Sequence, residues 1–424
     1  MSFCFALQDV TVEDGQGQSV SWSSTECGAN KPQNTRPLAI FPEKEKEELL
    51  AEFVPKVEEE IRLIKTEGVD VKLGEIETKA TCKKADLTMA DGKMVTSLLK
   101  LGGAFCTMCT HSQSDCHNLQ IIQEGFVIDR SIESITDLAV SLADQDTGEV
   151  IRARGDYTTR QGICGKPITE SDLTKNIPVC HSKIRTTEWI VELLIRYLSH
   201  KKWWTPTNAV RYTKEEKTSY TTARAKLEDN FYQKLAINLG DPGDMVTGNA
   251  FHKLATDTSR EFVCTLVEED IQEEFRNILI GLCAAVKIIN SQKRKVNVEK
   301  FRDMTLEVYV KLMQCFPWSA VSPSVHRILA HSWEVIELND SHGLGNLSEE
   351  GLEALNKYIR SRRETGARKD STMHNFMDTF NHLWDRSRPT IVEIARKIKR
   401  RTPKLMVMTE IEALVESLFL EDEE

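Results

Sequence analysis

Two cysteines stand three positions apart in Phe105-Cys106-Thr107-Met108-Cys109, and the way their site is completed determines how the rest of the chain is organised. A Cys-x-x-Cys pair on a tight turn can occupy two adjacent corners of a zinc tetrahedron, so the pair predicts half of a metal site. Two ordinary cysteines without a metal are the simpler interpretation. If a metal is bound, the other ligands have to come from elsewhere in the sequence.

Two sets of residues can complete this site. The nearby set, which would make a small zinc knuckle, consists of His111, Cys116 and His117. The distant set is His326 and His331 in Val325-His326-Arg327-Ile328-Leu329-Ala330-His331, which begins 326 − 109 = 217 positions after Cys109. Five positions on an α-helix separate side chains by about 140°, so both histidines can share a metal only if the helix ends or bends between them. Otherwise they are ordinary core or surface residues.

The segments on either side of the cysteines differ in their apolar pattern. From about Thr187 to Gln314 the apolar residues recur three and four positions apart, which predicts an almost wholly helical region. Before the cysteines, Phe3 to Val12 alternates, and Val20 with Trp22 resumes the alternation after Asp14-Gly15-Gln16-Gly17, which predicts a β-hairpin. The chain therefore opens with strands and continues into a long helical part.

Two acidic residues stand at positions where carboxylates can carry chemistry. Asp91 follows the short predicted strand 85–90 and precedes Gly92, where an ordinary turn is the alternative. Glu353 lies one position beyond the apolar stripe Leu352, Leu355 and Ile359 of a helix that starts at Ser348, where an ordinary surface acid is the alternative. Paired carboxylates from distant segments can hold two Mg²⁺ ions for phosphoryl transfer, provided that the segments meet.

Charge is unevenly distributed along the chain. The formal net charge is 55 − 65 = −10, but between Lys357 and Lys404 there are 14 Lys and Arg against 5 Asp and Glu, a local 14 − 5 = +9. Such a chain can present one basic surface to a phosphate backbone, although a solvated helix face is the alternative. The candidate DNA-binding residues are Lys357, Arg360, Arg362, Arg363, Arg368 and Lys369. A further cluster at 396–401 can serve as a nuclear import signal instead.

Length and composition exclude several classes of protein. The 424 residues, 40% of them hydrophobic, suffice for a sizeable core and roughly three domains, which excludes disorder throughout. No apolar run approaches about 18 residues, and MSFCFALQDV has no basic region before an apolar stretch, so neither a membrane span nor a secretory signal is expected. The eleven cysteines should be mostly reduced, as in an intracellular protein.

Four strings occur in the order found in one family of recombinases. They are Ala90-Asp91-Gly92-Lys93-Met94-Val95, Phe105-Cys106-Thr107-Met108-Cys109, Val325-His326 to His331-Ser332-Trp333-Glu334-Val335-Ile336, and Ser348-Glu349-Glu350-Gly351-Leu352-Glu353 to Arg360. Together they resemble the catalytic core of the V(D)J recombinase and, more closely, the Transib transposases related to it. Gly248-Asn249 with Lys253-Leu254, and Ala367-Arg368, are also similar, so the resemblance covers nearly the whole chain.

The resemblance implies an α/β fold, in which an RNase H-like domain is interrupted by a large zinc-bearing α-helical insertion and followed by a helical C-terminal region. Its parts would be the RNase H-like sheet in residues 1–103, the insertion in 104–345, the last RNase H-like helix in 346–366, and a basic helical region with an acidic tail in 367–424. One structural zinc would be shared by Cys106, Cys109, His326 and His331. Asp91 and Glu353 would be the second and third acids of a D-D-E triad that binds Mg²⁺ or Mn²⁺.

The family places its first catalytic Asp on a strand before the one that Phe3–Val12 resembles, and this chain begins at that later strand, with Asp9 and Asp14 as the only early substitutes. The function implied is a cut-and-paste DNA transposase that nicks DNA, forms hairpins on flanking DNA and transfers strands at transposon ends. The implied partners are double-stranded DNA with terminal inverted repeats and a second copy in a homodimer, in the nucleus, with no nucleotide cofactor. The alternative is a domesticated or truncated, non-catalytic DNA-binding or interaction module that keeps the zinc scaffold.

Overall fold

The computed structural model describes residues 2–5, 9–13, 19–23, 36–40, 47–73, 76–80, 92–102, 105–112, 114–143, 161–202, 213–239, 248–386 and 409–420. The chain divides into two compact units, each assembled from separate stretches of sequence. The strand-bearing unit comprises Met1–Leu98, Ile168–Leu173 and Asn346–Met406. The helical unit comprises Leu99–Pro167, Thr174–Gly345 and Val407–Glu424.

The strand-bearing unit holds all the named strands of the described residues. Its elements are β1 (Ser2–Phe5), β2 (Asp9–Glu13), β3 (Ser19–Ser23), β4 (Arg36–Ile40), α1 (Glu47–Thr66), β5 (Val69–Leu73), β6 (Ile76–Ala80), α2 (Gly92–Leu98), α13 (Glu350–Thr365) and α14 (Thr372–Arg386). The strands form three antiparallel pairs, β1 with β4, β2 with β3 and β5 with β6.

The predicted hairpin is confirmed for β2 and β3, where Val10 lies opposite Trp22. The alternating residues at the very start belong to a different pair, because Phe3 lies opposite Ala39 of β4. In the described residues the chain is mostly helical with few strands, and no sheet larger than two strands is present. The RNase H-like sheet is therefore not shown in this part of the chain.

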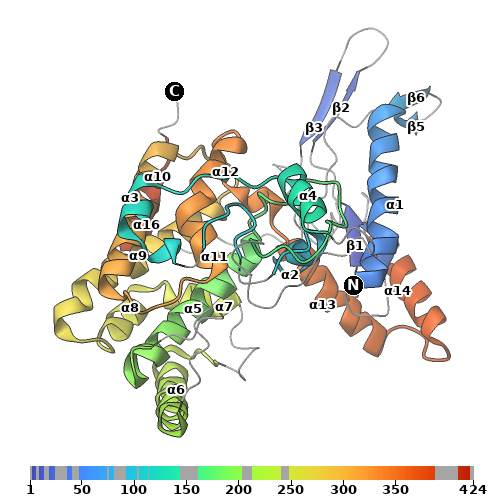
Figure 1. Ribbon diagram of the computed structural model, residues 1–424. Helices are drawn as coiled ribbons and strands as arrows, with labels where there is room; N and C mark the ends of the chain where they lie inside the picture. The colour runs from blue at the N-terminus through green and yellow to red at the C-terminus, as the bar shows by residue number, and fades with distance from the viewer. Residues whose placement is uncertain are drawn as a thin grey trace. The chain divides into compact units, whose positions relative to one another are not determined.

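Helices α13 and α14 form the part of the strand-bearing unit that carries the basic sequence. The hydroxyl of Ser348 accepts a hydrogen bond from the backbone N–H of Glu350 (3.2 Å) and so satisfies one free donor of the first turn of α13. Leu355 and Ile359, two residues of the predicted stripe, are buried against Leu383 of α14. The two helices are joined by the short loop 366–371 and lie side by side (Figure 1).

One carboxylate attaches the middle stretch 168–173 to this unit. Glu58 of α1 accepts hydrogen bonds from the Ser171 hydroxyl (2.8 Å) and from the backbone N–H groups of Ser171 (3.0 Å) and Glu170 (3.1 Å). Backbone N–H groups that lose contact with water need another hydrogen-bond partner. The Glu58 carboxylate is that partner, and it therefore fixes the path of the segment 168–173.

The helical unit contains the remaining elements. They are η1 (Asp115–His117), α3 (Leu119–Glu124), α4 (Ile132–Ser141), α5 (Val179–Ser199), α6 (Lys214–Leu235), α7 (Gly248–Leu254), α8 (Asp257–Cys264), η2 (Glu269–Ile271), α9 (Gln272–Ile289), α10 (Val298–Cys315), α11 (Pro323–His326), η3 (Arg327–His331), α12 (Ser332–Leu338), η4 (Leu344–Leu347) and α16 (Glu410–Ser417). The sequence boundary between the two units, after Gly345, falls within η4. The helical region predicted from Thr187 to Gln314 is thus confirmed where the structure describes it, in residues 187–202, 213–239 and 248–314.

The core of the helical unit is built around α9 and α10. Helix α9 is buried along most of its length, from Phe275 to Ile289, as its nearly continuous apolar sequence requires. The two helices approach closely at Gly281, where an added Cβ would collide with the side chain of Val308. Helix α16 lies against the same α9 (Figure 1).

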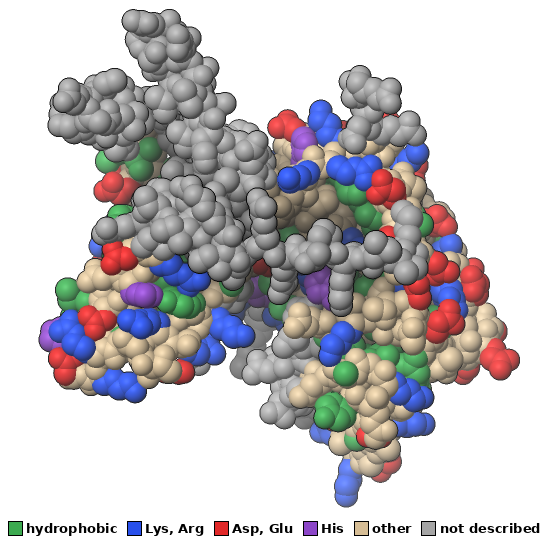
Figure 2. Space-filling model, turned by 180° about the vertical axis from the view of Figure 1, so that it is seen from behind, with side chains coloured by type: hydrophobic (Ala, Val, Ile, Leu, Met, Phe, Trp, Pro, Cys, Tyr) green, Lys and Arg blue, Asp and Glu red, His purple; other side chains and the backbone are tan. Residues whose placement is uncertain are grey.

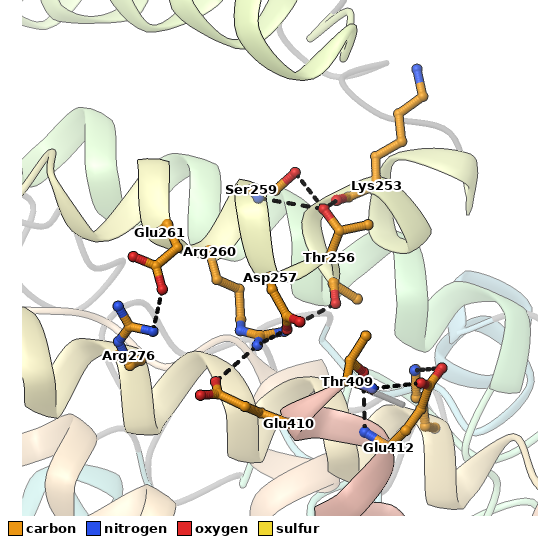
Figure 3. A network of polar contacts seen from close by, with 12 residues as sticks. Lys253, Thr256, Asp257, Ser259, Arg260, Glu261, Arg276, Thr409, Glu410 and Glu412 are labelled. Carbon is orange, nitrogen blue, oxygen red and sulfur yellow. Dashed lines mark hydrogen bonds and ion pairs between the residues drawn. The ribbon is translucent and has the colours of Figure 1, made fainter. Parts of the chain in front are cut away.

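The C-terminal helix α16 docks on the helical unit through acidic residues. Ile411 is fully buried, and Glu410 pairs with the buried Arg260 (3.1 Å), which also binds Asp257 (Figure 3). Glu416 pairs with Arg294 (2.6 Å). The described segment 409–420 is therefore part of the helical unit, whereas the sequence placed it in a separate region 367–424.

Two further expectations from the sequence concern the cysteines and membrane-spanning helices. The cysteines that the structure describes are all free thiols. No helix within the described ranges is long and apolar enough to cross a membrane.

Candidate metal centre

Four metal-ligating side chains meet in the interior of the helical unit. Cys106 and Cys109 lie in the loop before η1, while His326 ends α11 and His331 ends η3. All four residues are buried, and one ligand atom from each lies within 4.8 Å of all the others. The Sγ of Cys109 is 3.3 Å from Nε2 of His326. The distant set of ligands is therefore the one that the fold brings together, and this cluster could bind a metal ion such as zinc.

A turn of π-helix explains how two histidines five positions apart reach one point. Residues Arg327–His331 form a π-helix, inserted between the α-helical segments α11 and α12. Its i→i+5 hydrogen bonds bring the chain back to the same face after five residues, rather than after three or four as in an α-helix. The centroids of the His326 and His331 rings are consequently only 5.1 Å apart. The π-helical turn therefore supplies the departure from a regular α-helix that a metal shared by the two histidines requires.

The Cys-x-x-Cys turn is held by a neighbouring loop. The N–H of Met108 faces the Sγ of Cys106 (3.4 Å), and the carbonyl of Met108 accepts hydrogen bonds from the backbone N–H groups of Asp129 (3.1 Å) and Arg130 (3.0 Å). The Nε of Arg130 donates to the carbonyl of Cys109 (2.7 Å). These bonds hold the backbone of the Cys-x-x-Cys turn in place.

The outer nitrogen of each histidine has a polar neighbour. Nδ1 of His326 lies 3.0 Å from the hydroxyl of Tyr309, and Nδ1 of His331 lies 3.3 Å from a carboxylate oxygen of Glu334. Nε2 of His331 is buried and has no hydrogen-bond partner among the described residues. Metal-ligating histidines are usually oriented in this way, with one nitrogen on the metal and the other on a carboxylate or hydroxyl.

The protonation of the two thiols shows why the cluster suits a cation. Burial opposes ionisation of Cys106, but the nearby side chains of Cys109, His326 and His331 outweigh it and hold the pKa of this thiol well below its usual range. The Cys106 side chain, together with burial, raises the pKa of Cys109. Without a cation, ionisation of one sulfur therefore opposes ionisation of the other. A divalent metal removes this restriction, since it binds both sulfurs as thiolates.

The donor set and its surroundings fit zinc. Two sulfurs and two imidazole nitrogens form the Cys₂His₂ set that is typical of closed, structural zinc sites. Two buried arginines, Arg130 and Arg327, lie near the sulfurs; burial lowers the pKa of each, and the negative charge of Cys106 acts in the opposite direction. No solvent-exposed ligand position is present among the four residues, which favours a structural rather than a catalytic metal.

The nearby candidates do not belong to the cluster. Cys116 faces the outer nitrogen Nδ1 of His326 at 3.6 Å, and burial raises the pKa of its thiol to about 12. His117 binds the carbonyl of Ser319 through Nε2, and His111 packs edge-on against Phe126. A local zinc knuckle is therefore not formed.

The predicted catalytic acids lie largely beyond what the structure describes. Asp91 and Asp14 are outside the described residues. Asp9 lies in β2 and Glu353 in α13, but their side chains are not among the described ones. That Asp91 and Glu353 meet stays a prediction.

The candidate DNA-binding residues separate into two groups. Lys357, Arg360 and Lys369 are exposed and make no ion pair with another described residue. Arg368 is bound by both carboxylate oxygens of Asp378, and Arg363 donates to Asn375 and stacks on Phe376. The second group therefore helps to join α13 to α14. Arg362 is described below, and the cluster 396–401 lies outside the described residues.

Sequence reasoning missed the residues that support the metal ligands. Glu334 could have been found, because it stands three positions after His331 and so shares its helix face. Tyr309 and Arg130 carry no such signal, since they reach the cluster only through the packing of α10 and of the loop 125–131.

Comparison with known proteins adds no relative: the chain matches no family model, and a search of curated proteins finds no match.

Proposed function

We propose that this chain is the core of a zinc-stabilised DNA transposase or recombinase of the cut-and-paste type. The observation that carries the proposal is the buried cluster of Cys106, Cys109, His326 and His331. The resemblance to Transib transposases implied this set of four, although 217 positions separate Cys109 from His326. That four ligand-type residues so far apart in the sequence meet in the fold supports the proposal.

In this proposal the zinc is structural. It joins the loop that enters the helical unit to the helix that leaves it, and it holds α11, η3 and α12 against α10 through Tyr309. Since a structural zinc binds only the folded arrangement, its binding free energy adds directly to the stability of the unit. The finer fold assignment, an RNase H-like domain interrupted by this unit, is part of the proposal.

The proposed reaction is metal-dependent phosphoryl transfer at the ends of a transposon. Asp91 and Glu353, with one further Asp, would hold two Mg²⁺ or Mn²⁺ ions, which activate a water or hydroxyl and stabilise in-line displacement when bound. Lys357, Arg360 and Lys369, which are exposed and make no ion pair among the described residues, would hold the DNA backbone, because phosphate contacts fix the position of the duplex. The proposed partners are double-stranded DNA with terminal inverted repeats and a second copy of the chain, in the nucleus.

A nicking assay on DNA that carries transposon ends tests the proposal. The chain, alone and with an N-terminal extension that supplies the first Asp, is incubated with Mg²⁺ or Mn²⁺. Asp91→Asn and Glu353→Gln in the active form should abolish nicking but leave DNA binding in Ca²⁺ nearly intact, while Glu337→Gln on α12 serves as a control acid. DNA binding without nicking in every form would identify a non-catalytic DNA-binding module instead, and the absence of both would refute the proposal.

A further inference from the structure

Four side chains that the proposed function does not use meet at the seam between α13 and α14. Tyr358 and Arg362 are one helical turn apart on α13, and His382 and Arg386 are one turn apart on α14. Residues four positions apart lie on the same helix face, so both pairs face the same seam. We call these four residues the seam cluster.

The seam cluster is ordered by ring contacts. The hydroxyl of Tyr358 lies 2.5 Å from Nε2 of His382, and the two rings are stacked with centroids 5.9 Å apart and planes 19° from parallel. The guanidinium carbon of Arg386 lies 4.2 Å from the centroid of the Tyr358 ring. A cation–π contact of this kind uses the face of the ring and none of the guanidinium's N–H donors, so it positions Arg386 without occupying those donors.

The positive charge of the seam cluster is not compensated within the described residues. Neither Arg362 nor Arg386 forms an ion pair there, and Nε of Arg362 is buried without a hydrogen-bond partner among them. Burial, followed by the charges of Arg362 and Arg386, lowers the pKa of His382, while Asp385 acts in the opposite direction. Two arginines and one histidine thus share one small region.

The neighbouring arginines show that this lack of partners is particular to the seam. Arg363 also stacks on an aromatic ring, that of Phe376, but its Nε is used by Asn375. Arg368 is neutralised by Asp378 (2.8 Å). In these two helices and the loop between them, Arg363 and Arg368 therefore have structural partners, whereas Arg362 and Arg386 form no ion pair among the described residues.

We infer that the seam cluster is a phosphate-binding site, in which Arg362, Arg386 and His382 bind one phosphodiester group of a DNA backbone. Arg386 offers two parallel N–H donors to the phosphate oxygens, the geometry in which guanidinium binds phosphate best. In the tautomer that the site requires, Nε2 of His382 accepts the hydrogen bond from the Tyr358 hydroxyl, and the N–H at Nδ1 is a further donor. That the phosphate belongs to DNA rests on the proposed function, whereas the affinity for phosphate rests on the cluster alone.

Inorganic phosphate is the first probe. The ring resonances of His382 in the NMR spectrum of the full chain are assigned by their loss in His382→Gln and followed during titration with phosphate. We expect these resonances to shift in the wild type and to stay in place in the double variant Arg362→Gln/Arg386→Gln. Unshifted resonances in a folded wild type would overturn the inference.

Duplex DNA is the second probe, measured over a series of salt concentrations. Each lost phosphate contact lowers the slope of log affinity against log salt by about 0.9, so Arg362→Gln/Arg386→Gln, which removes the contact with one phosphate, should reduce the slope by about 1 and the affinity at physiological salt about tenfold. The matched control is Arg185→Gln/Arg276→Gln, in which both arginines come from the helical unit and are paired with Glu188 and Glu261. An unchanged slope in the seam variant, with DNA bound by the wild type, would refute the site.

A third variant tests the geometry without removing charge. A Cβ at Gly366 would collide with the guanidinium of Arg362, so Gly366→Ala should displace this side chain and weaken the response to phosphate. The two probes also separate the two proposals. If the wild type binds no DNA but phosphate shifts His382, the transposase proposal fails and the site stands for free phosphate or a small phosphorylated ligand. If DNA is nicked and the seam variant keeps its salt slope, only the seam inference fails.

Discussion

Replacing Glu334 by Gln gives the sharpest test of the metal centre, because it changes one charge outside the four ligands. The carboxylate lies 3.3 Å from Nδ1 of His331 and also accepts a hydrogen bond from the backbone N–H of Ile128 (3.2 Å). Glutamine keeps the size of the side chain but removes the negative charge that makes the imidazole a better ligand. Changes of this kind lower metal affinity about 10- to 100-fold, which corresponds to about 1.4 to 2.8 kcal/mol.

The measurement is a competition between the purified protein and a chromophoric zinc chelator. Glu337→Gln is the control, because Glu337 is exposed on the same helix α12 and should leave zinc affinity unchanged. If Glu334→Gln binds zinc as tightly as the wild type, Glu334 does not support a metal ligand. If the wild type carries no zinc and takes none up, the assignment of the whole cluster as a metal site is wrong.

Three further predictions concern stability. Cys106→Ser, or chelation of zinc in the wild type, should unfold the helical unit and cause aggregation, measured by metal content, circular dichroism and soluble yield, because binding of structural zinc is coupled to folding. Ile411→Ala should destabilise the helical unit by about 2 to 5 kcal/mol in a denaturant titration, since this side chain is fully buried under α16; a change near zero would show that α16 is not docked in solution. The hydrogen bond from Arg368 lowers the pKa of Asp378 from 3.8 to about 2, so its contribution is present above about pH 4 and is lost as the pH falls through 2. Asp378→Asn should therefore lower the melting temperature at pH 7 but not below pH 2, and an equal effect at both would contradict the ion pair.

The metal cluster was predictable in its members but not in its geometry. The Cys-x-x-Cys spacing pointed to a metal, and the family resemblance selected His326 and His331 over the nearby residues. A spacing of five positions on a regular α-helix argued against a metal shared by the two histidines. Nothing in Arg327-Ile328-Leu329-Ala330 predicts a π-helix. Such a turn is stabilised by what its side chains reach in the folded protein, so tertiary contacts decided it rather than local preference.

The helical middle of the chain was predictable because amphipathic periodicity reports burial directly. The position of α16 was not. The sequence grouped this segment with the basic helical region 367–424, yet Glu410 and Glu416 are held by Arg260 and Arg294 of the helical unit. Those arginines lie more than a hundred positions earlier in the sequence. Ion pairs between residues so far apart in the sequence cannot be predicted from a local sequence pattern.

The interleaving of the two units constrains how the chain can fold as it is synthesised. A polypeptide leaves the ribosome from its N-terminus, and domains ordinarily fold as soon as they are complete. Here the strand-bearing unit needs Asn346–Met406, and the helical unit needs α16 beyond that. The cysteines of the metal cluster emerge more than two hundred residues before their histidine partners, so Cys106 and Cys109 are unprotected thiols until those histidines have been made. A cell that makes this protein has to keep the nascent chain reduced and free of other metals over that interval.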